Sequence, residues 1–213
     1  MSSQYRYVER RIPLAVDVVA TVAALARDWS GSQVVYESNE KASWAAGELA
    51  SVEIRATGAT LIRSGQRQEF TGPPLAMVTE ALAAAGVEEW RAYGWAAFEL
   101  SHVLHNTGTP DGVLGHLMIP CAEIRLDGTS ALLRAGSASE VDELMRRLSE
   151  AVFDEPPNEQ RITVDLDDGS APYRAAVATA VERIRAGELE KVILSRVVPV
   201  DGELDLAGTY RTG

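Results

Sequence analysis

Several residue types that support common functions are scarce in this 213-residue sequence. Cys121 is its only cysteine, so no disulfide can form within the chain. No apolar run approaches the roughly 20 residues needed to cross a bilayer, and residues 1–11 lack the apolar stretch of a secretory signal. From these absences we expect a cytoplasmic protein without a membrane partner.

Basic residues are outnumbered: 20 Lys and Arg stand against 31 Asp and Glu, and the formal net charge is -11. Such a surface repels nucleic-acid phosphates, and no basic run provides a local exception. We therefore expect no nucleic-acid partner. The remaining composition, 46% hydrophobic and 24% charged, is that of a globular protein able to bury a core.

Common catalytic and metal-binding signatures are also missing. The sequence contains no glycine-rich phosphate loop and no G-x-S-x-G elbow. His102, His105, His116 and Cys121 lack the spacing of a tetrahedral metal site, and the acidic stretch 165–169 lacks the alternating ligands of a calcium loop. The sequence predicts no metal site in this chain.

What the sequence does contain is a mixture of helical and strand patterns, which predicts an α+β fold. Apolar residues at three- and four-residue intervals predict helices over 14–28, 73–86, 139–152 and 172–187, with Ser139 as a cap. Strands are expected over 34–36, 52–55, 60–63, 93–100, 118–126, 130–134 and 191–200. A turn at Thr57-Gly58 indicates an antiparallel meander, and Asp127-Gly128 indicates a hairpin. Residues 154–171, rich in proline and acidic residues, are a candidate long loop.

Three short segments resemble chorismate-binding enzymes, the family of anthranilate, aminodeoxychorismate, isochorismate and salicylate synthases. The first is IRAGELEKVILSR at residues 184–196, which is followed by TYR at 209–211. The second, YGWAAFE at 93–99, is similar to a strand of salicylate synthases. The third, VYES at 35–38, occupies the place of an early strand in these enzymes.

The resemblance implies a fold and a set of partners. Residues 1–213 would be the N-terminal part of a single chorismate-binding domain, namely one half of a two-sheet antiparallel β sandwich with helices on the outside. Chorismate would be the substrate, and a complementing C-terminal half would be the partner. That half would supply the ligands of a Mg²⁺ cofactor, so the chain alone is expected to be inactive.

The resemblance also implies a role for Lys191 as a catalytic residue. Family members that use ammonia have glutamine at the matching place, whereas those that form isochorismate or salicylate have lysine. Water loses a proton as it attacks C2 of chorismate, and an amine can accept that proton whereas an amide cannot. A strand over 191–200 would place Lys191 on one face with Ile193, Ser195 and Val197, beside apolar neighbours. From the residues alone, an ordinary solvated lysine is the alternative.

The expected function is therefore that of a salicylate synthase, which converts chorismate through isochorismate to salicylate and pyruvate, with Lys191 as the general base. An isochorismate synthase that releases its product is the close alternative. A hypothesis of another class is a non-catalytic regulatory module that binds an amino acid through the strand at 34–38 (VVYES).

Overall fold

The computed structural model describes residues 4–152, 164–165, 167, 170–200 and 205–212. These residues divide into two compact units. Unit 1 comprises residues 1–155 and 207–213, and unit 2 comprises residues 156–206. The predicted loop 154–171 lies mostly outside the described residues.

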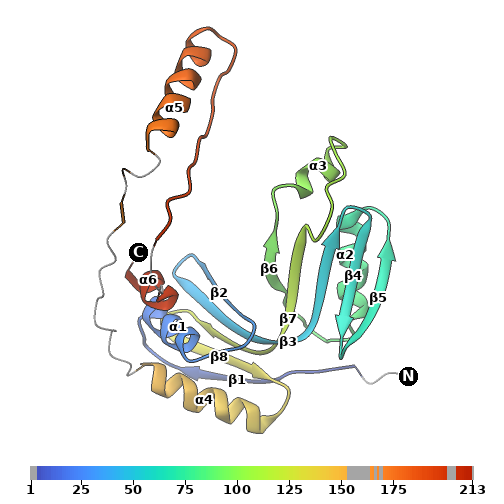
Figure 1. Ribbon diagram of the computed structural model, residues 1–213. Coiled ribbons are helices and arrows are strands. Elements are labelled where there is room, and N and C mark those ends of the chain that lie inside the picture. The colour runs from blue at the N-terminus through green and yellow to red at the C-terminus, as the bar shows by residue number, and fades with distance from the viewer. Residues whose placement is uncertain (1–3, 153–163, 166, 168–169, 201–204, 213) are drawn as a thin grey trace. The chain divides into compact units, whose positions relative to one another are not determined.

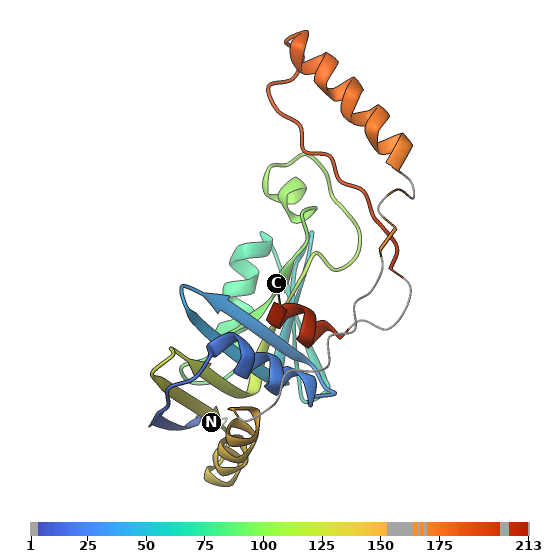
Figure 2. The ribbon, with the colours of Figure 1, turned by 90° about the vertical axis from the view of Figure 1, so that its left-hand side faces the viewer.

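Unit 1 is built on a single antiparallel sheet of eight strands, which curls as it crosses the unit (Figures 1 and 2). Its main path runs β1-β8-β7-β3-β4-β5, while β2 pairs with β3 and β6 pairs with β7. The strands are β1 (Val8–Pro13), β2 (Gln33–Ser38), β3 (Lys41–Arg55), β4 (Gly58–Arg63), β5 (Gln66–Thr71), β6 (Tyr93–Ala96), β7 (Gly115–Leu126) and β8 (Ser130–Ala135).

The two longest strands, β3 and β7, pair along their length and form the centre of the sheet. Each is flanked by two shorter strands, one beside each of its halves. The register of the β3–β7 pair shifts between Glu48 and Ala50, where β3 carries an extra residue. On one side of this bulge β3 contributes Ala42, Trp44 and Ala46 to one core, and beyond it other residues enter a second core. One strand therefore serves two cores.

Antiparallel pairing of neighbouring strands confirms the predicted meander and hairpin, but the turn between β3 and β4 lies at Ala56-Thr57, one residue before the predicted pair, and Gly58 is already paired with Arg55. Strands β2, β3 and β4 follow one another as antiparallel neighbours. The β7–β8 hairpin turns at Asp127-Gly128, where the Asp127 carboxylate accepts hydrogen bonds from the backbone N–H groups of Thr129 (3.0 Å) and Ser130 (2.6 Å). Gly128 has φ of 82°, a conformation that favours glycine.

One core lies between the sheet and the helices α1 (Val18–Arg27) and α4 (Ala138–Val152). Asp17 caps α1 by accepting from the Ala20 N–H at 2.9 Å, so the helix begins later than the predicted residue 14. In α4 the apolar stripe is buried as predicted, at Val141, Leu144 and Leu148. The predicted cap Ser139 is wrong: it lies inside the helix, and the hydroxyl and carbonyl oxygens of Ser137 accept from the first free N–H groups.

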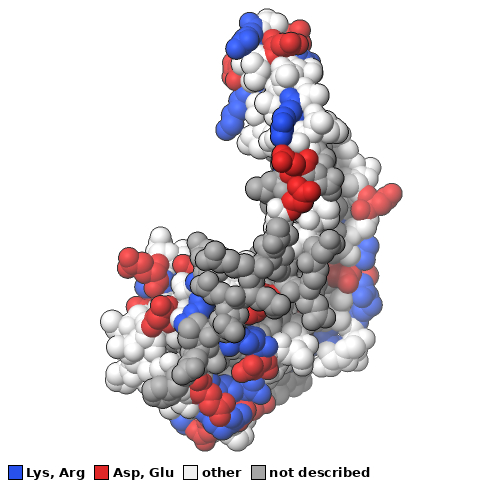
Figure 3. All heavy atoms as spheres, turned by 60° about the vertical axis from the view of Figure 1, so that its left-hand side comes forward, with Lys and Arg blue, Asp and Glu red and all other residues white. Residues whose placement is uncertain are grey.

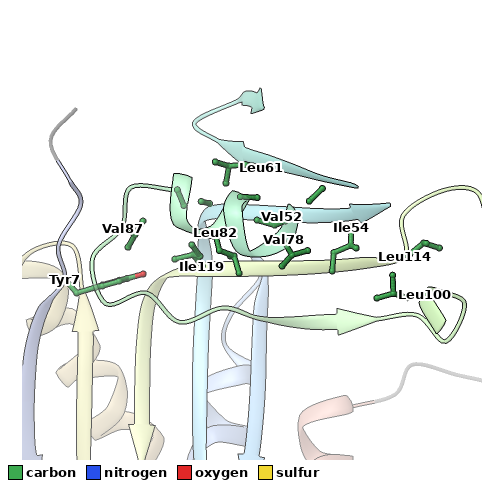
Figure 4. Packing of buried hydrophobic residues seen from close by; sticks show 14 residues of the cluster. Tyr7, Val52, Ile54, Leu61, Val78, Leu82, Val87, Leu100, Leu114 and Ile119 are labelled. Carbon is green, nitrogen blue, oxygen red and sulfur yellow. The ribbon is translucent and has the colours of Figure 1, made fainter. Parts of the chain in front are cut away.

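The second core lies under α2 (Pro74–Ala84), which begins at the predicted proline pair. Val78 and Leu82 of this helix point toward Val52 and Ile119 of the sheet (Figure 4). Leu75, predicted to lie on the inner stripe, is half exposed instead, and Ala81 takes an inward position.

The strand predicted over 93–100 forms in its first half only, and its predicted burial is wrong for most of the range. Only Tyr93–Ala96 forms a strand, β6, and the chain then turns into the short helix α3 (Leu100–Leu104). Tyr93 is buried, but Trp95 is 53% exposed and Phe98 is 81% exposed. Aromatic density in a sequence indicates apolar character, but it does not show whether neighbouring parts of the chain cover it.

Unit 2 contains the predicted helix α5 (Ser170–Arg185), which begins two residues before Pro172 and ends just before Gly187. The strand expected over 191–200 is wrong: residues 191–200 have no regular secondary structure. β-branched residues favour extended backbone, yet a strand also needs a neighbour to exchange hydrogen bonds with, and the described residues provide none here. The last helix, α6 (Leu206–Thr212), returns the chain to unit 1.

These features confirm an α+β fold with an antiparallel sheet and helices packed on it. Among the described helices, none is both long and apolar enough to pass through a bilayer.

Candidate functional site

Lys191, the predicted catalytic residue, lies in unit 2 on the segment that follows α5, and it is exposed. This segment is fastened to the helix at several points. The hydroxyl of Tyr173 donates to the carbonyl oxygen of Leu194 at 3.4 Å, and the Arg196 guanidinium lies 5.8 Å from the centre of the Tyr173 ring. Shortly before Lys191, Glu188 forms an ion pair with Arg183 of α5 at 2.9 Å. Lys191 is therefore presented from a helix-supported segment.

The apolar surroundings expected for Lys191 are not formed by the described residues. Ile193 is 81% exposed and Val197 is 94% exposed, so neither packs against other parts of unit 2. Among the described residues no carboxylate forms an ion pair with Lys191, and the nearby Glu188 is engaged with Arg183. The amine is thus accessible, and its role as a base stays a prediction.

Two of the family-like segments are brought together in unit 1. The Tyr210 hydroxyl, from the TYR segment on α6, donates to the Glu37 carboxylate of the VYES segment on β2 at 2.6 Å. Burial of Tyr210, with a further effect of this hydrogen bond, raises its pKa to about 12. The side chain also packs against the core beneath α1 and α4. Glu37 therefore anchors α6 to the sheet.

The second family-like segment, YGWAAFE at 93–99, begins in a buried polar network that the sequence analysis missed. The Tyr93 hydroxyl donates to the carboxylate of Glu123, which is 0% exposed. The same carboxylate accepts from Arg134 at 3.1 Å, and Arg134 is 3% exposed. Arg134 also donates to the Glu89 carbonyl oxygen at 2.8 Å, and its guanidinium lies 4.4 Å from the centre of the Tyr7 ring.

The network buries charged side chains, and burial in and around it shifts the pKa values of several groups. Burial raises the pKa of Tyr93, and the adjacent Glu123 carboxylate adds to this effect. Burial lowers the pKa of Arg125, which lies 3.4 Å from Glu123, while Glu123 acts in the opposite direction. Burial likewise raises the pKa of Tyr7. None of these groups is poised for proton transfer near neutral pH, so the network positions β6 rather than performing chemistry.

Metal ligands do not converge in the part of the chain that the structure describes: no three His, Cys, Asp or Glu residues form a group that could hold an ion. His102 contacts Thr107, and His116 lies 3.7 Å from Glu48. On the face shown in Figure 3, acidic and basic residues are interspersed over the described surface. A Mg²⁺ ion would find no built site among these residues.

Comparison with known proteins bears on the same segments. The model of a family described as "chorismate binding enzyme" matches residues 31–213, which include Lys191 and all three family-like segments. The chain is also similar to a salicylate synthase of Mycolicibacterium paratuberculosis (strain ATCC BAA-968 / K-10), with 30% identity over 211 residues. This similarity covers 94% of the chain but only 46% of the relative, so the chain spans about half the relative's length.

Proposed function

The chain belongs to the chorismate-binding enzyme family, and from this premise we propose that it forms part of a salicylate synthase. In this reaction water adds at C2 of chorismate, the C4 hydroxyl leaves to give isochorismate, and pyruvate is then eliminated to leave salicylate. The relative's name and the lysine at position 191 support the proposal.

Lys191 is the residue that we propose as the general base. Its amine takes the proton that water loses as the C2–O bond forms, a step that an amide at this position could not perform. Two features of unit 2 support this role: the segment carrying Lys191 is fastened to α5, and no described carboxylate pairs with the amine. A neutral amine is needed for proton uptake, and an ion pair would oppose that state.

The apolar shell around Lys191 would then come from another part of the enzyme. Ile193 and Val197 are exposed in unit 2. Exposed β-branched apolar residues on a segment without a neighbouring strand favour pairing with a strand from elsewhere. We propose that a complementing half of the enzyme covers this segment and removes water from the amine. The half of the relative's length that this chain does not match is where we place it.

Magnesium fits the proposed chemistry but not the residues described, which hold no cluster of carboxylates. We therefore place its ligands in the complementing half and derive no step through the metal. Chorismate is a dianion and this chain carries a net charge of -11, so the positive potential that holds the substrate must also come from that half.

The test uses the complete enzyme, obtained by reading the gene beyond codon 213 and purifying the product together with any completing half. The two lysines of this chain provide a matched pair of variants, because Lys41 is exposed on the β2–β3 hairpin of unit 1. Lys191→Gln should lower the rate of chorismate consumption by about 10²- to 10⁴-fold, the usual contribution of a general base. Lys41→Gln should leave it unchanged.

Salicylate fluorescence and chromatographic detection of isochorismate follow the two steps separately. Salicylate and pyruvate formed in equal amounts would support the proposal, whereas release of isochorismate alone would replace it by the isochorismate synthase alternative. Full activity in the Lys191→Gln enzyme, with folding verified by circular dichroism, would remove Lys191 from the mechanism.

A further inference from the structure

The turn that ends α5 fixes the chain shortly before Lys191. Gly187 has φ of 75°, and its N–H donates to the Ile184 carbonyl oxygen at 3.0 Å. The N–H of Glu188 donates to the Arg183 carbonyl oxygen, also at 3.0 Å. Two such hydrogen bonds around a left-handed glycine form a Schellman motif, which ends a helix in a defined direction. The backbone of Glu188 is therefore fixed relative to the last turn of α5.

The side chain of Glu188 is directed back to the same helix residue. Its carboxylate accepts from Nε of Arg183 at 2.9 Å, so these two residues are joined both by their backbones and by their side chains. Both side chains are more than half exposed. An exposed ion pair changes an equilibrium by about two- to fivefold, so this contact biases the position of Glu188 moderately.

Beyond the turn, the chain runs back along α5 (Figures 1 and 2) and is held again after Lys191. The Tyr173 hydroxyl of α5 donates to the Leu194 carbonyl oxygen at 3.4 Å. Lys191 lies between this contact and the turn, three residues after Glu188. Three residues span at most about 11 Å, so the long side chains of Glu188 and Lys191 are able to meet when Glu188 has no other partner.

The charge of Glu188 is the one near Lys191 that a described side chain holds. The charged residues close to Lys191 in unit 2 are Glu182, Arg183, Arg185, Glu188, Glu190 and Arg196. Glu190 directly precedes the lysine and forms no ion pair with the described residues, so its influence on the amine is constant. An ion pair between Glu188 and Lys191 would add to that influence and favour the protonated amine.

We propose that Arg183 is a positioning residue for Lys191. By holding the Glu188 carboxylate it keeps that charge away from the amine, and it thereby raises the share of Lys191 in the neutral form. The expected effect is that of one exposed ion pair, about two- to fivefold in the neutral share. Its value for catalysis rests on the proposed function, in which the neutral amine takes a proton from water.

Acetylation of the 213-residue chain tests the proposal without any turnover, because only a neutral amine attacks the reagent. Lys41 and Lys191 are the two lysines of the chain and both are exposed, so Lys41 serves as an internal reference. At about pH 8 only a small part of a lysine's amine is neutral. Limiting isotope-labelled acetic anhydride and peptide mass spectrometry then give the ratio of the two rates. Arg183→Gln should lower the ratio of Lys191 to Lys41 by about two- to fivefold.

Two further variants show whether the change comes from Glu188. Arg185→Gln removes the same charge from the last turn of α5 but leaves Glu188 paired, so it should change the ratio little. Combining Arg183→Gln with Glu188→Gln should return the ratio to its original level. An unchanged ratio in Arg183→Gln, an equal decrease in Arg185→Gln, or no recovery in the double variant would overturn the proposal.

The complete enzyme separates this proposal from the proposed function. Near neutral pH, Arg183→Gln should lower kcat by about two- to fivefold with KM unchanged, and the deficit should disappear at higher pH, where the amine is neutral in both enzymes. A deficit of equal size at every pH would overturn the positioning role. Full turnover in the Lys191→Gln enzyme would instead contradict the proposed function, while the acetylation ratio would still show whether Arg183 controls the charge of the amine.

Discussion

Replacing Glu123 by glutamine tests how much the buried ion pair between Glu123 and Arg134 contributes to the stability of unit 1. Glutamine keeps the size of the side chain but leaves the Arg134 guanidinium, 3% exposed, without its most buried counter-charge. Removing one partner of a buried pair commonly costs about 3–5 kcal/mol. Because Arg134 retains Glu9 at 2.6 Å, we expect the lower end, about 3 kcal/mol.

Urea denaturation followed by tryptophan fluorescence measures this effect in unit 1 alone, since all four tryptophans lie there. With a denaturant slope of about 2 kcal/mol per molar, the urea midpoint should fall by about 1.5 M. Glu143→Gln is the matched control, because Glu143 pairs with Arg146 on the exposed face of α4 and should shift the midpoint little. A decrease below about 0.3 M for Glu123→Gln would refute the reasoning.

Two further predictions concern the sheet. The hydrogen bonds that Asp127 accepts, above all those from Ser130, hold the pKa of its carboxyl well below the ordinary 3.8. The ionised carboxylate therefore contributes to the free energy of unfolding above pH 3.8, and this contribution is lost as the pH falls toward the lowered pKa. Asp127→Asn should lower the urea midpoint at pH 7 and make the midpoint fall less steeply in acid. Gly94→Ala should destabilise unit 1 by about 1–3 kcal/mol, because a Cβ there would lie 1.8 Å from the His116 carbonyl oxygen of β7, whereas Gly108→Ala, with ordinary contacts, should be neutral by the same assay.

Periodicity predicted most elements because local pattern and tertiary packing agree there. The apolar stripe of α4 and the proline start of α2 give both type and position. The turn at Asp127-Gly128 is similarly local, since the side chain of Asp127 satisfies the backbone two and three residues later. At Tyr93–Leu100 and at 191–200 the outcome depends on what covers or pairs with the segment, which is not a local property.

The buried polar network was missed because charged residues at alternate strand positions are read as facing solvent. The register of the hairpin was not available from the sequence either. A two-residue turn with Asp127-Gly128 at its centre would set Leu126 opposite Thr129, whereas the structure sets Leu126 opposite Ala131 and, three residues outward, Glu123 opposite Arg134. Opposite charges at directly paired positions indicate a cross-strand ion pair. Its complete burial could not be inferred, because that depends on the N-terminal segment and on the loop after α2.

The hydrogen bond between Tyr210 and Glu37 has a consequence for protein engineering. It joins positions 173 apart and anchors the chain beyond residue 206 to unit 1, so the 51 residues from 156 to 206 are an insertion between two stretches of unit 1. The entropy of closing such a loop grows slowly, by about 0.6 kcal/mol for each doubling of its length. A reporter domain placed within this insertion should therefore disturb the sheet less than deletion of the seven residues that follow it.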